Sequence, residues 1–315
     1  MSKKYEFTDE TIEVDGHTLH RIRAVRCFSD VKAGDLGGWI EKEHNLSHED
    51  HAWVYGEGKV YGDAMVIDDA RVLGCAKVYD NALIKDRARV YNHAQVYNDA
   101  SVSCNAEVGS YAMVYNHAMV YGNALVLDNA KVYDFCCISG DAEVCDDAAV
   151  YGYASVCDSA FVGHQAKVYG VAAIYGNARI LDRAEVYDDT SVYNNAKVGG
   201  SALVFGNARI AGSARIAGNA EVCGCANISG GTAIMGDANI CGRADYITFK
   251  NFWSSGRYFT WTRSNNMWRV GCFYGTGEEL IKKAYKDSEK SGREYERVVR
   301  YVESILADEK KGGEE

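Results

Sequence analysis

The stretch that decides the fold is VYGEGKVYGDAMVIDDARVLGCAKVYDNAL, residues 54–83, in which every sixth residue is Val or Ile. This spacing continues without an insertion from Val54 to Ile240 and makes 32 hexads, of which 23 begin with Val and nine with Ile. The third residue is Gly, Asp or Asn in 29 hexads, and the fifth is Ala in 28. A six-residue period over so much of the chain predicts a repeat architecture rather than separate globular domains.

Side-chain requirements turn each hexad into one flat side of a coil. A short strand alternates its faces, so the Val or Ile at position 1 points inward while its two neighbours point outward. Position 3 collects residues that tolerate a left-handed backbone, as a corner between two sides requires. The Ala at position 5 then faces inward beside the corner, where little room remains. Three sides make a coil of 18 residues, and we predict an all-β solenoid, a single-stranded left-handed parallel β-helix of about 10–11 coils.

A column of aromatic residues tests the 18-residue coil independently. Position 2 of every third hexad is aromatic over nine consecutive coils, at Tyr61, Tyr79, Tyr97, Tyr115, Tyr133, Tyr151, Tyr169, Tyr187 and Phe205. Only an 18-residue coil places these residues in one column, with neighbouring rings about 4.8 Å apart. Two interpretations stay open: the rings stack to stabilise the array, or the column binds a protein partner or a second copy of the chain.

Lysines flank this column, each one residue before an inward Val, at Lys59, Lys77, Lys131 and Lys167. Lysines beside stacked aromatic rings are suited to binding a polyanion or an extended chain through charge and stacking. We favour a simpler role, in which the lysines solvate a flat face and discourage aggregation. The net charge of −10 also argues against a general nucleic-acid-binding protein.

Segments without the period flank the array, so we predict three parts: an N-terminal hairpin and cap at 1–50, the β-helix at 51–245 and a small α+β module at 246–315. Two alternating runs around Asp15 and Gly16 predict the hairpin. Because a solenoid exposes the apolar cross-section of its first coil, we expect a plug there, formed by Leu36, Trp39 and Leu46.

The C-terminal module is predicted to contain three antiparallel strands followed by two helices. The strands are the aromatic-rich stretches YITFKNFW, GRYFTWTR and NMWRVGCFYGT, which Ser-, Gly- and Asn-rich turns separate. The spacings of Thr276 with Glu279 and of Ser291 with Glu294 are typical of capping boxes at helix N-termini.

Composition limits the compartment and the chemistry. The chain has no proline, as expected if nearly every backbone N–H pairs along the coils. The N-terminus has no apolar core and no run approaches 18 apolar residues, so we expect a cytoplasmic protein without a membrane span. We interpret the eleven cysteines as reduced, small apolar fillers of the repeat, including Cys223 and Cys241 on successive rungs. No cofactor is expected.

Histidines supply the candidates for catalysis and for metal binding. A general base is one interpretation of the three that lie at or beside corners of the array, but nothing in the sequence gives them a partner, and we favour solvated turn residues: His93, His117 and His164. Metal ligation is one interpretation of three that precede the array, but their spacing matches no standard site, and we favour a polar surface loop: His44, His48 and His51.

The segments HRIRAV (residues 20–25) and AGDLGGWIE (33–41), followed by hexads such as VYGNA, resemble the YdcK-like hexapeptide-repeat proteins of bacteria and phage. The resemblance extends to residue 244. It implies a left-handed β-helix and an acetyltransferase activity taken from the wider hexapeptide acyltransferases. It brings no assigned catalytic residue to any position of this sequence.

The acyltransferases that the hexads resemble interrupt the coil with a loop and place a histidine in a cleft between the subunits of a trimer. The 32 hexads here have no inserted residue, so no loop of that kind leaves the array. We therefore favour a non-catalytic scaffold or binding protein that acts through a protein partner or as a homo-oligomer, a dimer or a trimer. An acyl-CoA-dependent acyltransferase is the alternative.

Overall fold

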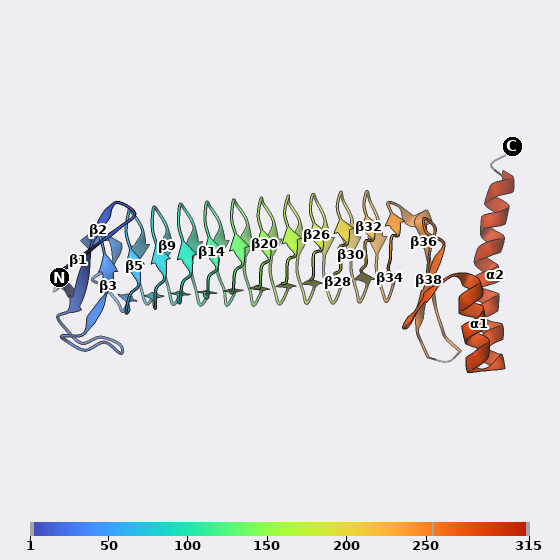
Figure 1. Cartoon of the computed structure of the whole chain (residues 1–315), viewed down its shortest axis with the longest axis horizontal. Coiled ribbons are helices and arrows are strands. Elements are labelled where there is room, and N and C mark those ends of the chain that lie inside the picture. Colours follow the sequence, from blue (N-terminus) through green and yellow to red (C-terminus); the bar gives the residue numbers. More distant parts are fainter. Residues whose placement is uncertain (1–2, 254, 313–315) are drawn as a thin grey trace.

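The computed structural model describes residues 3–253 and 255–312, and it is a long rod of stacked coils with non-repeating elements at both ends (Figure 1). Strands of two residues alternate with tight turns from β4 (Trp53–Val54) to β35 (Asn239–Ile240). Strands 18 residues apart pair in parallel, as between Lys59 and Lys77. The hexads therefore form the parallel β-solenoid that their spacing predicts, with about 11 rungs on a side.

The three sides of the coil are named here by what they present to solvent. The tyrosine face contains β5 (Lys59–Val60), β8 (Lys77–Val78), β11 (Gln95–Val96), β14 (Met113–Val114), β17 (Lys131–Val132), β20 (Ala149–Val150), β23 (Lys167–Val168), β26 (Glu185–Val186), β29 (Leu203–Val204), β32 (Glu221–Val222) and β35. The neutral face contains β6 (Met65–Val66), β9 (Leu83–Ile84), β12 (Ser101–Val102), β15 (Met119–Val120), β18 (Cys137–Ile138), β21 (Ser155–Val156), β24 (Ala173–Ile174), β27 (Ser191–Val192), β30 (Arg209–Ile210) and β33 (Asn227–Ile228).

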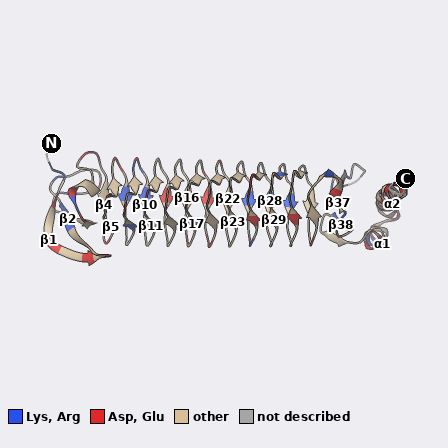
Figure 2. Cartoon of the chain, turned by 90° about the horizontal axis from the view of Figure 1, so that it is seen from above, with Lys and Arg blue, Asp and Glu red and all other residues tan. Residues whose placement is uncertain are grey.

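The third side, the charged face, carries basic and acidic outward residues that are grouped in blocks along the rod (Figure 2). It contains β4, β7 (Arg71–Val72), β10 (Arg89–Val90), β13 (Glu107–Val108), β16 (Leu125–Val126), β19 (Glu143–Val144), β22 (Phe161–Val162), β25 (Arg179–Ile180), β28 (Lys197–Val198), β31 (Arg215–Ile216) and β34 (Ala233–Ile234).

The corners explain the residues found at position 3. The residue at position 3 of every hexad from Gly56 to Gly236 has a positive φ, including the three that are not Gly, Asp or Asn: Cys104, Ser110 and His164. Aspartate has a second use there, because a carboxylate oxygen of each corner Asp accepts the backbone N–H of the next rung. All nine make this bond: Asp68, Asp80, Asp86, Asp128, Asp134, Asp146, Asp158, Asp182 and Asp188.

The N-terminal segment caps the first coil and also begins the array. Strands β1 (Tyr5–Val14) and β2 (His17–Ala24) form the predicted hairpin. Strand β3 (Leu36–Ile40) pairs with β2 and, in parallel, with β5, and the 3-10 helix η1 (Glu43–Asn45) follows. Leu46 joins the core of the coil as expected. Trp39 is buried, but it packs outside that core with Leu19 and Tyr61 beneath the hairpin, so its predicted place in the plug is wrong. The prediction for Leu36 is wrong: it is 46% exposed, because the next residue, Gly37, takes the inward position.

The C-terminal module has four strands instead of the three predicted: β36 (Tyr246–Lys250), β37 (Tyr258–Thr262), β38 (Met267–Val270) and β39 (Phe273–Gly275), after the 3-10 helix η2 (Arg243–Asp245). The third expected strand divides at Gly271, whose φ of 60° makes a turn. Helices α1 (Gly277–Asp287) and α2 (Glu289–Gly312) follow. The Thr276–Glu279 capping box is confirmed. At α2, however, Ser288 and not Ser291 is the capping residue, because the Ser288 hydroxyl accepts the Ser291 N–H.

Two further observations bear on the predictions from composition. Cys223 and Cys241 form a disulfide, so the prediction of reduced thiols is wrong for this pair. Parallel stacking brings their Cα atoms to 4.5 Å, which lies within the range that a disulfide spans. No helix in the described residues is both long and apolar enough to cross a bilayer.

Candidate functional site

The aromatic column on the tyrosine face is a continuous stack. Its eight consecutive ring pairs, from Tyr61–Tyr79 to Tyr187–Phe205, have centroids 4.8–5.1 Å apart and planes within 5° of parallel. Tyr61 is buried beneath the N-terminal hairpin, where its hydroxyl donates to Asp15, and the other rings are half-buried. Burial raises the pKa of Tyr133 to about 12, with the neighbouring tyrosines as a second cause. Stacking therefore accounts for most of the surface of these rings.

Most of the lysines beside the column are engaged within the chain. Lys77 lies 3.2 Å from the Asp15 carboxylate and Lys167 lies 2.8 Å from that of Glu185, while Lys59 donates to a backbone carbonyl. Among the described residues only Lys131 of the four forms none of these contacts. One cation does not make a polyanion-binding strip, so the arrangement favours the solvating role.

A second aromatic column is more exposed than the tyrosine stack. It lies on the corner between the tyrosine and neutral faces, where Phe135, Tyr153 and Val171 are 49%, 65% and 51% exposed. His117 stacks on Phe135 at 4.6 Å, and Phe135 stacks on Tyr153 at 5.1 Å. These residues form an apolar ridge on a molecule whose other corners are mainly polar, so we call them the corner ridge.

The three histidines of the array lie apart and have different surroundings. His93 stacks on Tyr111 at 4.9 Å. His117 lines an open furrow of about 710 Å³ with the carboxylates of Asp63, Asp80, Asp99 and Asp134, and its Nδ1 is 3.6 Å from Asp99, beyond a good hydrogen bond. His164 Nδ1 accepts the backbone N–H of Asp182. A furrow lined by carboxylates repels an anionic substrate, so His117 is not a convincing base for one. His164 lies outside that furrow, and its Nδ1 is also 3.1 Å from the Asp182 carboxylate.

The three histidines before the array do not converge on a common point within the described residues. His44 is exposed on η1. His48 stacks on Tyr5 at 4.3 Å, its Nδ1 accepts the Lys4 N–H, and burial lowers its pKa. His51 lies on a corner with its Nδ1 2.7 Å from the Asp69 carboxylate. The structure thus gives each a separate environment, and only His51 has a carboxylate partner.

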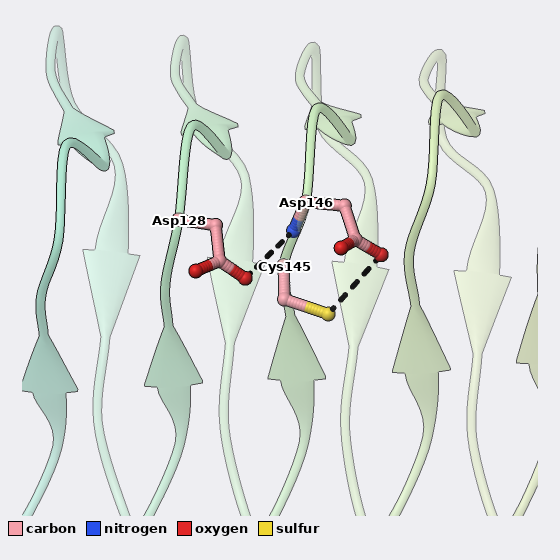
Figure 3. Close-up of side chains that lie close together, drawn as sticks. All are labelled: Asp128, Cys145 and Asp146. Atoms are coloured by element: carbon pink, nitrogen blue, oxygen red, sulfur yellow. Dashed lines mark hydrogen bonds between the residues drawn. The ribbon is translucent and has the colours of Figure 1, made fainter.

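One group in the described residues does bring three metal-binding side chains together, namely Asp128, Cys145 and Asp146 (Figure 3). The carboxylate of Asp128 accepts the Asp146 N–H, and that of Asp146 accepts from the Cys145 thiol. Burial, followed by the Asp146 charge, raises the pKa of the Cys145 thiol to about 12, so the thiolate that binds metals is disfavoured. We assign this group to the hydrogen-bonded ladder of corner aspartates.

A histidine, a carboxylate and three arginines lie together around His51, in an open pocket of about 390 Å³. Its lining consists of Ser29, His51, Asp69, Arg71, Arg87 and Arg89. Arg71 lies 3.2 Å from the Asp30 carboxylate and Arg89 lies 3.1 Å from that of Glu107. Arg87 forms no ion pair within the described part of the chain. Arg87 is therefore the lining guanidinium group that can pair with an anion without first leaving a carboxylate of the described chain.

The geometry of the pocket follows from the coil. His51, Asp69 and Arg87 are 18 residues apart and occupy one corner column, while Arg71 and Arg89 occupy successive strands of the charged face. Asp69, as a carboxylate, only accepts hydrogen bonds, so the 2.7 Å contact requires the proton on Nδ1 of His51. Nε2 then carries a lone pair, the state that a general base needs. The sequence interpretation missed Asp69 and the arginines. The 18-residue spacing leads from His51 to Asp69 and then to Arg87, and Arg71 and Arg89 lie two residues further along.

Comparison with known proteins gives a distant relative over part of the chain. No protein-family model matches the chain. A segment of 81 residues is 32% identical to a protein of Escherichia coli strain K12 named uncharacterized acetyltransferase YdcK. The match covers 23% of this chain and 25% of that protein, so the chain matches about a quarter of the length of its curated relative. The resemblance predicted from the hexads is thus confirmed over a limited region, as distant similarity to a protein that is named an acetyltransferase.

Proposed function

We propose that the chain transfers an acyl group from an acyl-CoA donor, with the His51 pocket as the site of reaction. The observation that carries the proposal is the 2.7 Å contact between His51 and Asp69 in a pocket that three arginines line. The name of the E. coli relative supports the same class of reaction. The preference for a non-catalytic scaffold in the sequence interpretation rested on the absence of an inserted loop, and this pocket needs no loop within the array.

In the proposed reaction, His51 Nε2 removes a proton from an acceptor amine or hydroxyl as that group attacks the thioester carbonyl. The C–S bond breaks, the acyl group stays on the acceptor, and the thiolate of CoA takes up the proton. Asp69 holds the His51 ring in the required tautomer and stabilises the imidazolium that forms. Arg87, free of any ion pair in the described residues, and the two paired arginines would bind the phosphates of the donor, which guanidinium groups recognise in a bidentate manner.

The proposal is tested by measuring release of CoA from acetyl-CoA by mass spectrometry in the presence of a panel of amines and sugars. We expect turnover by the wild-type chain and a loss of about 10²–10⁴-fold in His51→Gln, the usual contribution of a general base. His93→Gln is the matched control, because His93 is an exposed histidine stacked on Tyr111. Equal turnover by His51→Gln and the wild type would exclude this pocket as the site.

A binding scaffold is the second candidate, and the corner ridge favours it. Exposed, stacked rings at Phe135 and Tyr153 beside Val171 are suited to contact an apolar surface of a protein partner. Replacement of Phe135 and Tyr153 by Ser would then abolish binding of that partner and leave CoA release unchanged. Loss of CoA release in this variant, with the fold intact, would argue against two separate roles.

A further inference from the structure

The charged face carries a column of charges in which Arg89 and Glu107 pair with each other at 3.1 Å, while the others have no ion pair among the described residues. The residues that precede the inward Val or Ile of its strands are, in order, Arg89, Glu107, Leu125, Glu143, Phe161, Arg179, Lys197, Arg215 and Ala233. Glu143, Arg179 and Arg215 form no ion pair with any described residue. Arg179, Lys197 and Arg215 are exposed. Along this flat surface a basic residue, Arg89, is therefore followed by an acidic block and then by a second basic block (Figure 2).

The order of these charges is self-complementary about Phe161. If a second copy lies antiparallel against this face, with a two-fold axis along the strands at Phe161, identical columns face each other in reverse order. Glu143 then lies opposite Arg179, and Glu107 lies opposite Arg215, each pair occurring twice by symmetry. Leu125 lies opposite Lys197, and Arg89 lies opposite Ala233. No like charges meet within these nine rungs.

Other registers of the same arrangement are worse. A shift of the axis by half a rung toward the N-terminus brings Arg89 opposite Arg215, and a full rung brings Glu143 opposite itself. A half-rung shift toward the C-terminus keeps one kind of opposite-charge pair, Glu143 with Lys197, and a full rung brings Arg179 opposite itself. Among these registers, only the one centred on Phe161 gives two kinds of ion pair without a like-charge contact, and like charges that meet across an interface oppose association.

The relief of the face matches the same register. The residues that follow the inward Val or Ile of these strands form the neighbouring outward column, in which Leu127 and Leu181 project while Gly163 and Gly199 have no side chain. Centring on Phe161 places Leu127 opposite Gly199 and Leu181 opposite Cys145, so a projecting side chain faces a small one at each of these rungs. Nine rungs of about 4.8 Å and a side of about 15 Å bury roughly 600 Å² on each copy, at the lower end of specific interfaces.

We infer that the charged face is the interface of an antiparallel homodimer whose two-fold axis passes beside Phe161. The inference does not depend on acyl transfer, because Arg89 is the one residue of the His51 pocket that lies within the nine rungs, and it faces Ala233 and takes no part in the ion pairs across the axis. Arg71, one rung outside the paired region, is already held by Asp30 in its own chain. The partner is a second copy of this chain, because the charge order of the face, when reversed, places Glu143 opposite Arg179 and Glu107 opposite Arg215.

Charge reversal tests this register with the full-length chain. Sedimentation velocity and native mass spectrometry over a concentration series should give twice the monomer mass of 34.6 kDa. Glu143→Arg alone and Arg179→Glu alone should each raise the dimer dissociation constant about 100-fold, since each change acts twice across the axis. The double variant, which swaps the two charges, should recover dimerisation. Lys131→Glu, an exposed reversal on the tyrosine face, should change nothing.

Three outcomes would overturn the inference. The first is a monomer at every concentration, which would leave the basic rungs to an anionic ligand. The second is an oligomer whose mass is insensitive to both single reversals, which would locate the interface on another face. The third is a double variant that stays monomeric although its circular dichroism matches that of the wild type, which would show that Glu143 and Arg179 do not meet.

Discussion

The tyrosine face and the charged face are built from the same hexad, yet they use their outward positions differently. The tyrosine face repeats one kind of residue for nine rungs, and each ring is packed against the next. The charged face changes residue from rung to rung, and several of its charges find no partner among the described residues. Residues of the repeating column contact one another along the rod. Residues of the varying column include charged side chains that remain able to contact another molecule. We therefore assign stability to the first face and recognition to the second.

The largest effect expected from this comparison is that the chain loses structure at alkaline pH, when the stacked tyrosines ionise. Burial raises the pKa of the stacked tyrosines, to about 12 for Tyr133, above the value of about 10 in unfolded chains. A raised pKa means that the neutral ring favours the folded state, so this stability is complete below about pH 10 and is lost as the pH rises through the folded pKa. Tyrosinate absorbance and circular dichroism should therefore change together above pH 10. Ionisation of the stacked rings without any loss of structure would contradict the assignment.

The next effect concerns the stack itself. Replacing Tyr115 and Tyr133 by Ser removes three ring pairs, each worth about 0.5–1.5 kcal/mol beyond area burial, and should lower the free energy of unfolding by about 2–4 kcal/mol. Urea titration followed by circular dichroism measures the change. Tyr121→Ser is the control, since Tyr121 is 39% exposed on the neutral face and should cost less than about 1 kcal/mol. Equal costs would mean that the stack adds nothing.

A smaller loss of stability is expected when a corner aspartate is replaced, such as Asp134 at the corner between the tyrosine and neutral faces. Asp134 accepts the Gly152 N–H at 3.2 Å and the Asn116 side-chain amide at 2.9 Å. Asp134→Ala should lower the free energy of unfolding by about 1 kcal/mol, the net value of such bonds, in the same urea titration. Asp134→Asn, which keeps an acceptor oxygen, should cost less. A larger loss in the Asn variant would indicate that charge, and not hydrogen bonding, selects Asp there.

The regular features of the molecule could be predicted from the sequence because each hexad position takes the same kind of residue in nearly every repeat. Val or Ile at position 1 and Ala at position 5 fixed the inside of the coil, and residues such as Asn98 at position 3 fixed its corners. The 18-residue spacing of the tyrosines predicted that they form one column, and stacking was one of the two interpretations of that column. Errors fall where one residue decides alone: Gly37 turns Leu36 outward, Gly271 divides a strand, and Ser288 caps α2 in place of Ser291.

The candidate site was missed for a related reason. His51 precedes the first complete hexad, so it was read as part of a loop and grouped with its neighbours in sequence, His44 and His48. Its neighbours in space come from the next two coils, Asp69 and Arg87, which the hexad pattern treats as variable outward residues. Sequence proximity was the wrong measure there, since the coil places residues 18 positions apart in contact.

One titration tests most directly the claim that recognition belongs to the charged face and its corner. Acetyl-CoA is titrated calorimetrically into the wild-type chain, into Arg87→Ala and into the variant with Ser at positions 115 and 133. We predict that Arg87→Ala binds about tenfold more weakly, through loss of a charge-assisted contact, and that the tyrosine variant binds as the wild type does. Arg183→Ala, an exposed arginine at another corner, should also bind normally. Weaker binding by the tyrosine variant together with unchanged binding by Arg87→Ala would contradict the account.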